Sequence, residues 1–209
     1  MYTTDGIYWT AEVELEVPQE GLTIHYSYQI EQNGIVIRKE WNNFPRCLFL
    51  SGTPRKKYRI NDCWKNIPEQ LYLYSSAFTE ALLSHPERVD IPQGYKKGLI
   101  IKAYAPRINK DYCQAICGNQ KALGNWDPEK AVLMSDSNFP EWQVELDASK
   151  LKYPLEYKFI LCHKQERKID CWEKNPNRYL ADPEIKTNET LVISDRYVYF
   201  DIPIWKGAV

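Results

Sequence analysis

The sequence predicts an all-β protein of two immunoglobulin-like β-sandwich modules, the first incomplete, joined by a short linker that contains one helix. Three observations predict this class. Short segments of alternating apolar and polar residues recur along the chain, turn residues separate them, and one pattern of residues occurs twice. Many short strands at such intervals are typical of sandwiches.

The first predicted module covers residues 1–70. Its segments 10–17, 24–31 and 35–41 alternate in polarity, and Asn33-Gly34 marks a tight hairpin turn between the last two. We therefore expect three strands here, with the tryptophan that precedes the first of them in the core.

A linker is expected over residues 71–97. Apolar residues in 69–85 recur at helical intervals, and the pattern ends at His85-Pro86 before a polar stretch. This predicts one amphipathic helix followed by an extended connection.

The second predicted module covers residues 98–202, and residues 203–209 lie beyond it. Five strands are expected in this module, over 99–106, 114–118, 142–146, 155–161 and 189–194. Trp142 stands within an alternating strand, so we expect it in the core.

One pattern links the two modules. Trp9 lies 37 positions before Arg46, and Trp142 lies 36 before Arg178. Residues 99–133 have no counterpart in the first copy. The first module is therefore expected to lack its opening strands, and the sequence leaves open what covers the resulting sheet edges.

The same arginines are preceded by tyrosines at matching distances. Tyr26 stands 20 positions before Arg46, and Tyr157 stands 21 before Arg178. Because the arginine also occurs in the less complete copy, we expect it to hold a turn or to pair with a carboxylate.

Composition narrows the classes of partner. The 209 residues carry a net charge of -1. A nucleic-acid-binding protein needs a basic surface, and this balance of charges does not predict one. No apolar run is long enough for a membrane span, and the first residues do not resemble a signal peptide. The six cysteines show no metal-binding spacing, so we expect small buried hydrophobes, no cofactor and no metal, and a cytoplasmic location.

Catalysis by this chain is not expected. No pair of carboxylates, no Ser-His-Asp pattern and no phosphate-binding glycine loop stands out. Seven tryptophans and fifteen tyrosines instead suit a surface on which flat ligands stack.

Five residues of the second module are candidates for such a surface. Trp126 lies in a segment rich in Gly, Asn and Pro, and Trp172 ends a strand beside a turn. Their indoles would stack on sugar rings, while Lys158, Glu173 and Asn177 would exchange hydrogen bonds with hydroxyl groups.

Four ordered motifs carry a family resemblance. LGNWDP at 123–128, WQVEL at 142–146, EYKF at 156–159 and WEKNPNR at 172–178 resemble the starch-binding domains of carbohydrate-binding module family 20. The resemblance spans residues 98–202. It implies a β-sandwich that binds α-1,4-glucans without a cofactor, through the five candidate residues.

The first copy departs from this pattern. It has no LGNW segment, Ser27 stands where Lys158 stands, and Pro45 stands where Asn177 stands. Glu40-Trp41 takes the place of the Trp-Glu pair in reversed order. Trp41 is therefore a candidate for a weak site only.

Tandem modules followed by the segment 203–209 resemble the N-terminal region of 4-α-glucanotransferases of glycoside hydrolase family 77. This implies an α-glucan ligand and a C-terminal catalytic domain as partners. The alternative is a scaffold or dimerisation module with little sugar binding of its own, in which case a homodimer is expected.

Overall fold

The computed structural model describes residues 1–77, 94–108, 110–166, 168–195 and 198–201, and most of its regular structure is β-strand. Two five-stranded sheets account for most of these strands. The predicted all-β sandwich class is confirmed.

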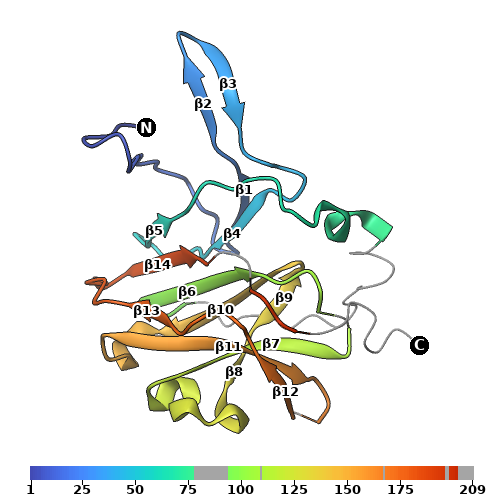
Figure 1. Cartoon of the computed structure of the whole chain (residues 1–209). Helices are drawn as coiled ribbons and strands as arrows, with labels where there is room; N and C mark the ends of the chain where they lie inside the picture. The colour runs from blue at the N-terminus through green and yellow to red at the C-terminus, as the bar shows by residue number, and fades with distance from the viewer. Residues whose placement is uncertain (78–93, 109, 167, 196–197, 202–209) are drawn as a thin grey trace.

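The sandwich consists of two sheets that face each other (Figure 1). The first sheet contains, in spatial order, β5 (Lys57–Asn61), β14 (Glu189–Ser194), β6 (Lys97–Tyr104), β10 (Glu141–Asp147) and β9 (Ser135–Asn138). The second contains β12 (Ile169–Trp172), β11 (Leu155–His163), β7 (Tyr112–Gly118) and β8 (Val132–Leu133), with β13 (Arg178–Leu180) also paired to β11. A short 3₁₀ turn, η5 (Ala148–Lys150), follows β10.

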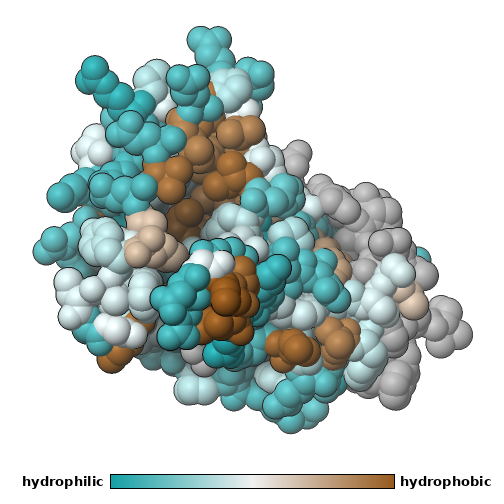
Figure 2. All heavy atoms as spheres, turned by 90° about the horizontal axis from the view of Figure 1, so that it is seen from above, coloured by the Kyte–Doolittle hydropathy of each residue, from teal (hydrophilic) through white to brown (hydrophobic). Residues whose placement is uncertain are grey.

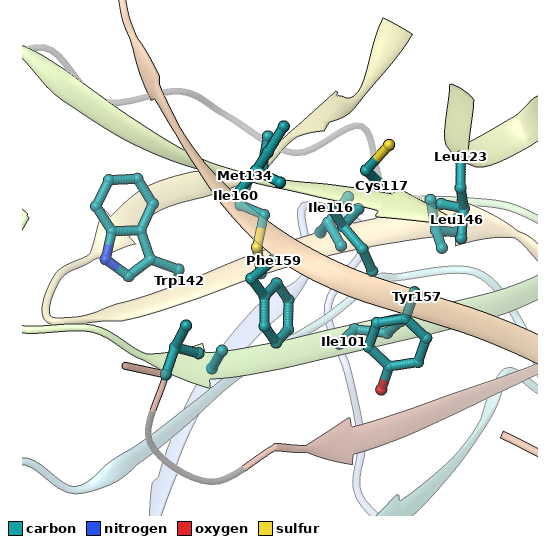
Figure 3. Close-up of a cluster of buried hydrophobic side chains, with 14 of the residues drawn as sticks. Ile101, Ile116, Cys117, Leu123, Met134, Trp142, Leu146, Tyr157, Phe159 and Ile160 are labelled. Atoms are coloured by element: carbon teal, nitrogen blue, oxygen red, sulfur yellow. The ribbon is translucent and has the colours of Figure 1, made fainter. Parts of the chain in front are cut away.

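Alternate residues of the strands fill the space between the sheets (Figure 3). On β6, Leu99 and Ile101 point into this core, and Phe159 enters it from β11. Trp142 is fully buried, and its indole N–H donates to the Ala105 carbonyl over 3.2 Å. Its predicted place in the core is confirmed.

A third layer covers the other face of the first sheet. The strands β1 (Leu22–Tyr26) and β4 (Arg46–Leu50) form a two-stranded sheet above it (Figure 1). Leu48 and Leu50 of this layer contact Ile100 and Val192, which point away from the main core. The first sheet is therefore buried on both faces.

The two halves of the chain also share one sheet. β5 belongs to the N-terminal half, yet it runs parallel to β14 from Lys57↔Glu189 to Asn61↔Ile193. Across the layers, the ammonium of Lys102 donates to the Cys47 carbonyl and lies 2.9 Å from the Glu141 carboxylate. The strand pairing and the hydrogen bond from Lys102 to Cys47 thus join the halves, in addition to apolar contact, while Glu141 holds the Lys102 ammonium in place.

The predicted hairpin is confirmed. β2 (Gln29–Gln32) pairs with β3 (Ile35–Lys39), and both turn residues, Asn33 and Gly34, have positive φ angles of 52° and 78°. All nine strand residues are exposed, and the hairpin projects from the layers (Figure 1). Hydrophobic residues gather on the face seen from above (Figure 2). Ile35 of the hairpin is 68% exposed.

The predicted strand over 10–17 is wrong. This segment has no strand pairing, and the only bridge near it joins Tyr2 to Thr10 among the residues that the structure describes. Trp9 is 57% exposed, so its predicted place in the core is also wrong. Alternating residues become a buried strand face only beside a partner strand. Trp142 has β6 and β9 on its two sides, and Trp9 has neither.

The linker begins with a 3₁₀ turn, η1 (Leu71–Tyr74), in which Leu73 and Tyr74 are buried. Residues 78–85 of the predicted helix lie outside the described residues, as do residues 202–209. The helix therefore stays a prediction beyond this first turn.

A buried ion cluster lies at the edge of the C-terminal half. Arg178 pairs with Glu173 over 2.9 Å and with Asp195 over 3.4 Å. Tyr157 donates its hydroxyl to Asp195 over 2.7 Å, and the guanidinium lies 4.9 Å from the centroid of the Phe159 ring. The arginine thus ties β11, β13 and the end of β14 together.

The N-terminal half contains a matching cluster. Arg46 pairs with Glu40 over 2.6 Å and with Asp62 over 3.1 Å. Tyr26 donates to Asp62 over 2.9 Å, and the guanidinium lies 5.3 Å from the Tyr28 ring centroid. The expected pairing of both arginines with carboxylates is confirmed.

Candidate functional site

Three predicted binding residues share the outer face of the second sheet. Trp172 of β12 lies directly opposite Ile160 of β11, and Lys158 stands two residues before Ile160 on the same strand. Cross-strand partners and alternate residues point to the same side of a sheet. Cys117 of β7 lies opposite Lys158 and faces the same way.

The third of these residues, Trp126, reaches this face from a short loop. It ends the 3₁₀ segment η3 (Lys121–Trp126), which lies beneath β11 and β8 in Figure 1. Gly124, Asn125 and Trp126 have positive φ angles of 82°, 53° and 61° in succession. A residue with a bulky side chain rarely adopts this backbone conformation. It persists only where surrounding contacts fix it, and such residues are often found at functional sites.

The surrounding contacts that fix the loop can be named. A Cβ on Gly124 would lie 2.9 Å from the Lys130 carbonyl oxygen, so only glycine fits there. The carboxylate of Asp127 accepts from the Glu129 backbone N–H over 3.1 Å and so caps the next turn, η4 (Pro128–Lys130). A hydrogen bond from Lys130 holds the pKa of Asp127 below its usual range.

Sequence reasoning did not identify this role of Asp127, although an aspartate followed directly by proline is a typical start of a helical turn. The loop also contacts the sheet, because the Trp126 backbone N–H lies beside the Cys117 thiol. Burial raises the pKa of that thiol. Cys117 is fully buried, as expected for a small hydrophobe, whereas for Cys63 this expectation is wrong because its side chain is exposed.

The two indoles lie side by side. Their ring centroids are 6.2 Å apart and the ring planes meet at 47°. Both side chains are partly exposed. Aromatic faces of this kind are surfaces on which flat apolar groups can stack.

Polar groups flank the indoles. Asn177 immediately precedes Arg178, whose partner on β11 is Tyr157, so it lies at the end of the strand pair nearest Lys158. The Asn177 side chain is exposed, and its amide donates to Glu156 over 2.8 Å. Glu156 had not been singled out from the sequence. Glu156 orients the Asn177 amide. In the sequence, only its place in the EYKF motif could have indicated this role.

Glu173 departs from the expectation. Its side chain is fully buried, and its oxygens accept from the Phe159 backbone N–H over 2.8 Å and from the Arg178 guanidinium over 2.9 Å. A carboxylate held in this way is turned away from the outer face. Its side chain therefore stabilises the ion cluster instead of meeting a ligand.

Trp41 also departs from the expectation. The matching ion clusters make Glu40 the counterpart of Glu173, so Trp41 corresponds to Lys174 and Lys39 corresponds to Trp172. Trp41 is only 9% exposed and packs edge-to-face on Tyr74 at a centroid distance of 4.9 Å. The reversed Glu-Trp order therefore points the tryptophan into a small core.

The described parts of the chain contain neither a metal-binding cluster nor a membrane-spanning helix. No group of three or more His, Cys, Asp and Glu side chains gathers there in a way that could hold a metal ion. None of the helices found there has the length and apolar character needed to cross a membrane.

Known proteins match the C-terminal half. Residues 106–192 match the model of the starch binding domain family CBM_20. Over 66 residues the chain is 30% identical to Glucoamylase-1 of Schizophyllum commune, which is 32% of this chain and 11% of that enzyme. The chain thus spans about a tenth of the length of that relative.

Solved structures of similar proteins include part of an amylase and a glucoamylase. One is the family 20 module of a maltotetraose-forming amylase from Pseudomonas saccharophila, at 18% identity and a TM-score of 0.39, covering 47% of this chain and 99% of that one. Another is a family 15 glucoamylase from Hypocrea jecorina, at 23% identity and a TM-score of 0.40, covering 58% and 19%. All four ordered motifs between 123 and 178 lie within the residues 106–192 that match the family model.

Proposed function

We propose that this chain is a non-catalytic α-1,4-glucan binding region, and that its ligand is starch, glycogen or a maltooligosaccharide. The observation that carries the proposal is the indole pair Trp126–Trp172 at 6.2 Å on one sheet face. Lys158 and Asn177 beside it supply hydrogen-bond donors for sugar hydroxyls.

The proposed binding mode is weak and gains from repeated contacts. Each neutral hydrogen bond contributes about 0.5–1.5 kcal/mol net in water. A glucan chain longer than the site, or several modules on one polymer, would raise the apparent affinity without any new contact.

We further propose that the N-terminal half is a second copy of the same module. The repeated cluster supports this, because Tyr26, Glu40, Arg46 and Asp62 take the parts of Tyr157, Glu173, Arg178 and Asp195. Four residues matched in type and in contact, and not only in spacing, are hard to explain by chance. The boundaries proposed are 1–70 for the first module, 71–97 for the linker and 98–202 for the second module.

The parent protein is proposed to be a cytoplasmic 4-α-glucanotransferase of glycoside hydrolase family 77. The tandem arrangement and the resemblance of residues 203–209 to the start of that catalytic domain support this. The six cysteines are all free thiols, which suits a reducing compartment. The named relatives are glucoamylases and an amylase, so an enzyme that acts on α-glucan is the broader form of the proposal.

The experiment is a titration with maltoheptaose and β-cyclodextrin, followed by tryptophan fluorescence. The unaltered chain should give a saturable change. Trp126→Ala/Trp172→Ala should lower the affinity at this site at least tenfold, because both stacking faces are removed. Trp9→Ala is the matched control, since Trp9 is exposed and remote in sequence from the site. A folded unaltered chain that binds neither sugar would refute the proposal.

A second candidate function is a scaffold that packs on another domain or chain. It is favoured by exposed apolar side chains in the N-terminal half, including Val13 at 75%, Ile35 at 68% and Ile37 at 58%. Self-association that persists in the Trp126→Ala/Trp172→Ala variant would support it.

A further inference from the structure

The N-terminal half contains a groove that the glucan site does not use. It lies between the end of β3 and the segment that follows β5, and its volume is ≈ 340 Å³. Its lining includes Arg38, Lys39, Trp41, Trp64, Asn66 and Ile67.

Contacts fix the walls of this groove. Arg38 lies over the Trp64 ring, 5.0 Å from its centroid, and donates to the Asn66 side chain over 3.0 Å. The Trp41 backbone N–H donates to the Lys65 carbonyl over 3.1 Å and so joins the two walls. The buried Trp41 forms part of the floor, while Trp64 stays partly exposed.

The accessible groups are those that recognise a sugar. Trp64 offers an indole, Ile67 is 68% exposed at the rim, and Lys39 and Asn66 are exposed hydrogen-bonding side chains. A partly exposed indole bordered by an ammonium and an amide is also what Trp126, Lys158 and Asn177 provide on the other half. A sugar ring has apolar faces and hydroxyl groups at its edge, so it matches an indole that is bordered by an ammonium and an amide.

The position of the groove points the same way. Lys39 stands one residue before Glu40, the carboxylate that pairs with Arg46, as Trp172 stands one residue before Glu173. The groove thus opens beside the place that the Trp172 indole occupies in the other half. Here the indole comes from Trp64, two residues after Asp62 of the ion cluster.

We propose that this groove is a second, independent carbohydrate-binding site, and that it takes an α-glucan chain with one sugar ring against Trp64. The proposal rests on the proposed function for its ligand class. It differs in its residues, since neither Trp41 in the floor nor the 123–128 loop supplies the stacking face.

Isothermal titration with β-cyclodextrin tests it through the number of sites per chain. We expect two for the unaltered chain, one for Trp64→Ala and one for Trp126→Ala/Trp172→Ala. The triple variant should bind none. Trp9→Ala should keep both sites, because it removes an exposed indole elsewhere. Thermal unfolding of each variant is recorded alongside.

The outcomes separate the two proposals. If the unaltered chain has one site that only Trp126→Ala/Trp172→Ala removes, the groove is not a site and the proposed function stands. If the unaltered chain binds nothing, both fall. Should Trp64→Ala fail to fold, Lys39→Ala/Asn66→Ala changes only exposed side chains, and it must weaken one of the two sites at least tenfold. Unchanged binding in that variant would overturn the proposal.

Discussion

Arg178 illustrates how single residues of this chain are fixed by buried charge. Its guanidinium pairs with two carboxylates that lie largely out of water, and the Glu173 side chain is fully buried. The attraction offsets the cost of desolvating these charges only while both partners are present.

We therefore expect Arg178→Ala to lower the free energy of unfolding by about 3–5 kcal/mol, because it leaves a buried carboxylate without its partner. Urea unfolding followed by circular dichroism measures this. The neighbouring control is Asn177→Ala, which changes an exposed side chain and should stay within about 0.5 kcal/mol of the unaltered chain. Equal losses in the two variants would show that the cluster does not stabilise the fold.

The sequence predicted the structural role of the two arginines, but it did not predict which carboxylates pair with them. The recurrence of Arg46 and Arg178 predicted a structural role, and contacts confirm it. Glu173 was expected to face a ligand, since a motif gives the residue type without showing which way the side chain turns. Its burial and its hydrogen bonds to Phe159 and Arg178 show that this carboxylate points inward.

At the scale of the element, the loop that carries Trp126 depends on left-handed backbone. Gly124→Ala would place a Cβ 2.9 Å from the Lys130 carbonyl oxygen at a φ of 82°. We expect a loss of at least about 1 kcal/mol in stability and a displaced Trp126. Glucan affinity, measured by fluorescence titration, should fall about tenfold or more.

Gly34→Ala is the matched control for this prediction. Its φ is 78°, and nothing lies within 4 Å of the added Cβ. It should cost about 1 kcal/mol through backbone strain alone, because the β2–β3 hairpin is far in sequence from the loop. Glucan affinity should be unchanged. If both variants bind equally well, the loop geometry does not position the indole.

The elements differ in how well the sequence predicted them. Strands with a partner next to them in the fold, such as β10 and β11, were predicted because local alternation and packing agree. Residues 10–17 alternate equally well and form no strand, because no strand lies beside them. The parallel pairing of β5 with β14 is set by contacts more than 120 positions apart, which local patterns do not contain.

At the scale of the whole molecule, the interface between the two halves contains a buried carboxyl group. Glu145 lies on β10 opposite Ile100, on the face of the first sheet that the N-terminal half covers. It is only 8% exposed, and one of its carboxylate oxygens has no hydrogen-bond partner among the described residues. Burial raises its pKa to about 7, an effect that Lys56 and the backbone N–H groups of Gly94 and Tyr95 only partly offset.

This raised pKa makes the stability of the joined halves depend on pH. The folded state holds the Glu145 proton more tightly than the unfolded chain, in which the ordinary value of 4.5 applies. The stabilisation is therefore complete below pH 4.5, declines as the pH rises towards 7, and is absent above it.

Glu145→Gln keeps the shape of the side chain and cannot ionise. It should be more stable than the unaltered chain at pH 8, on the order of 1 kcal/mol, with the difference shrinking as the pH falls to 5. Urea unfolding at several pH values measures this, beside the exposed Glu69→Gln as control. If the free energy of unfolding of Glu145→Gln and of the unaltered chain changed with pH in the same way, the ionisation of Glu145 would not affect the contact between the halves.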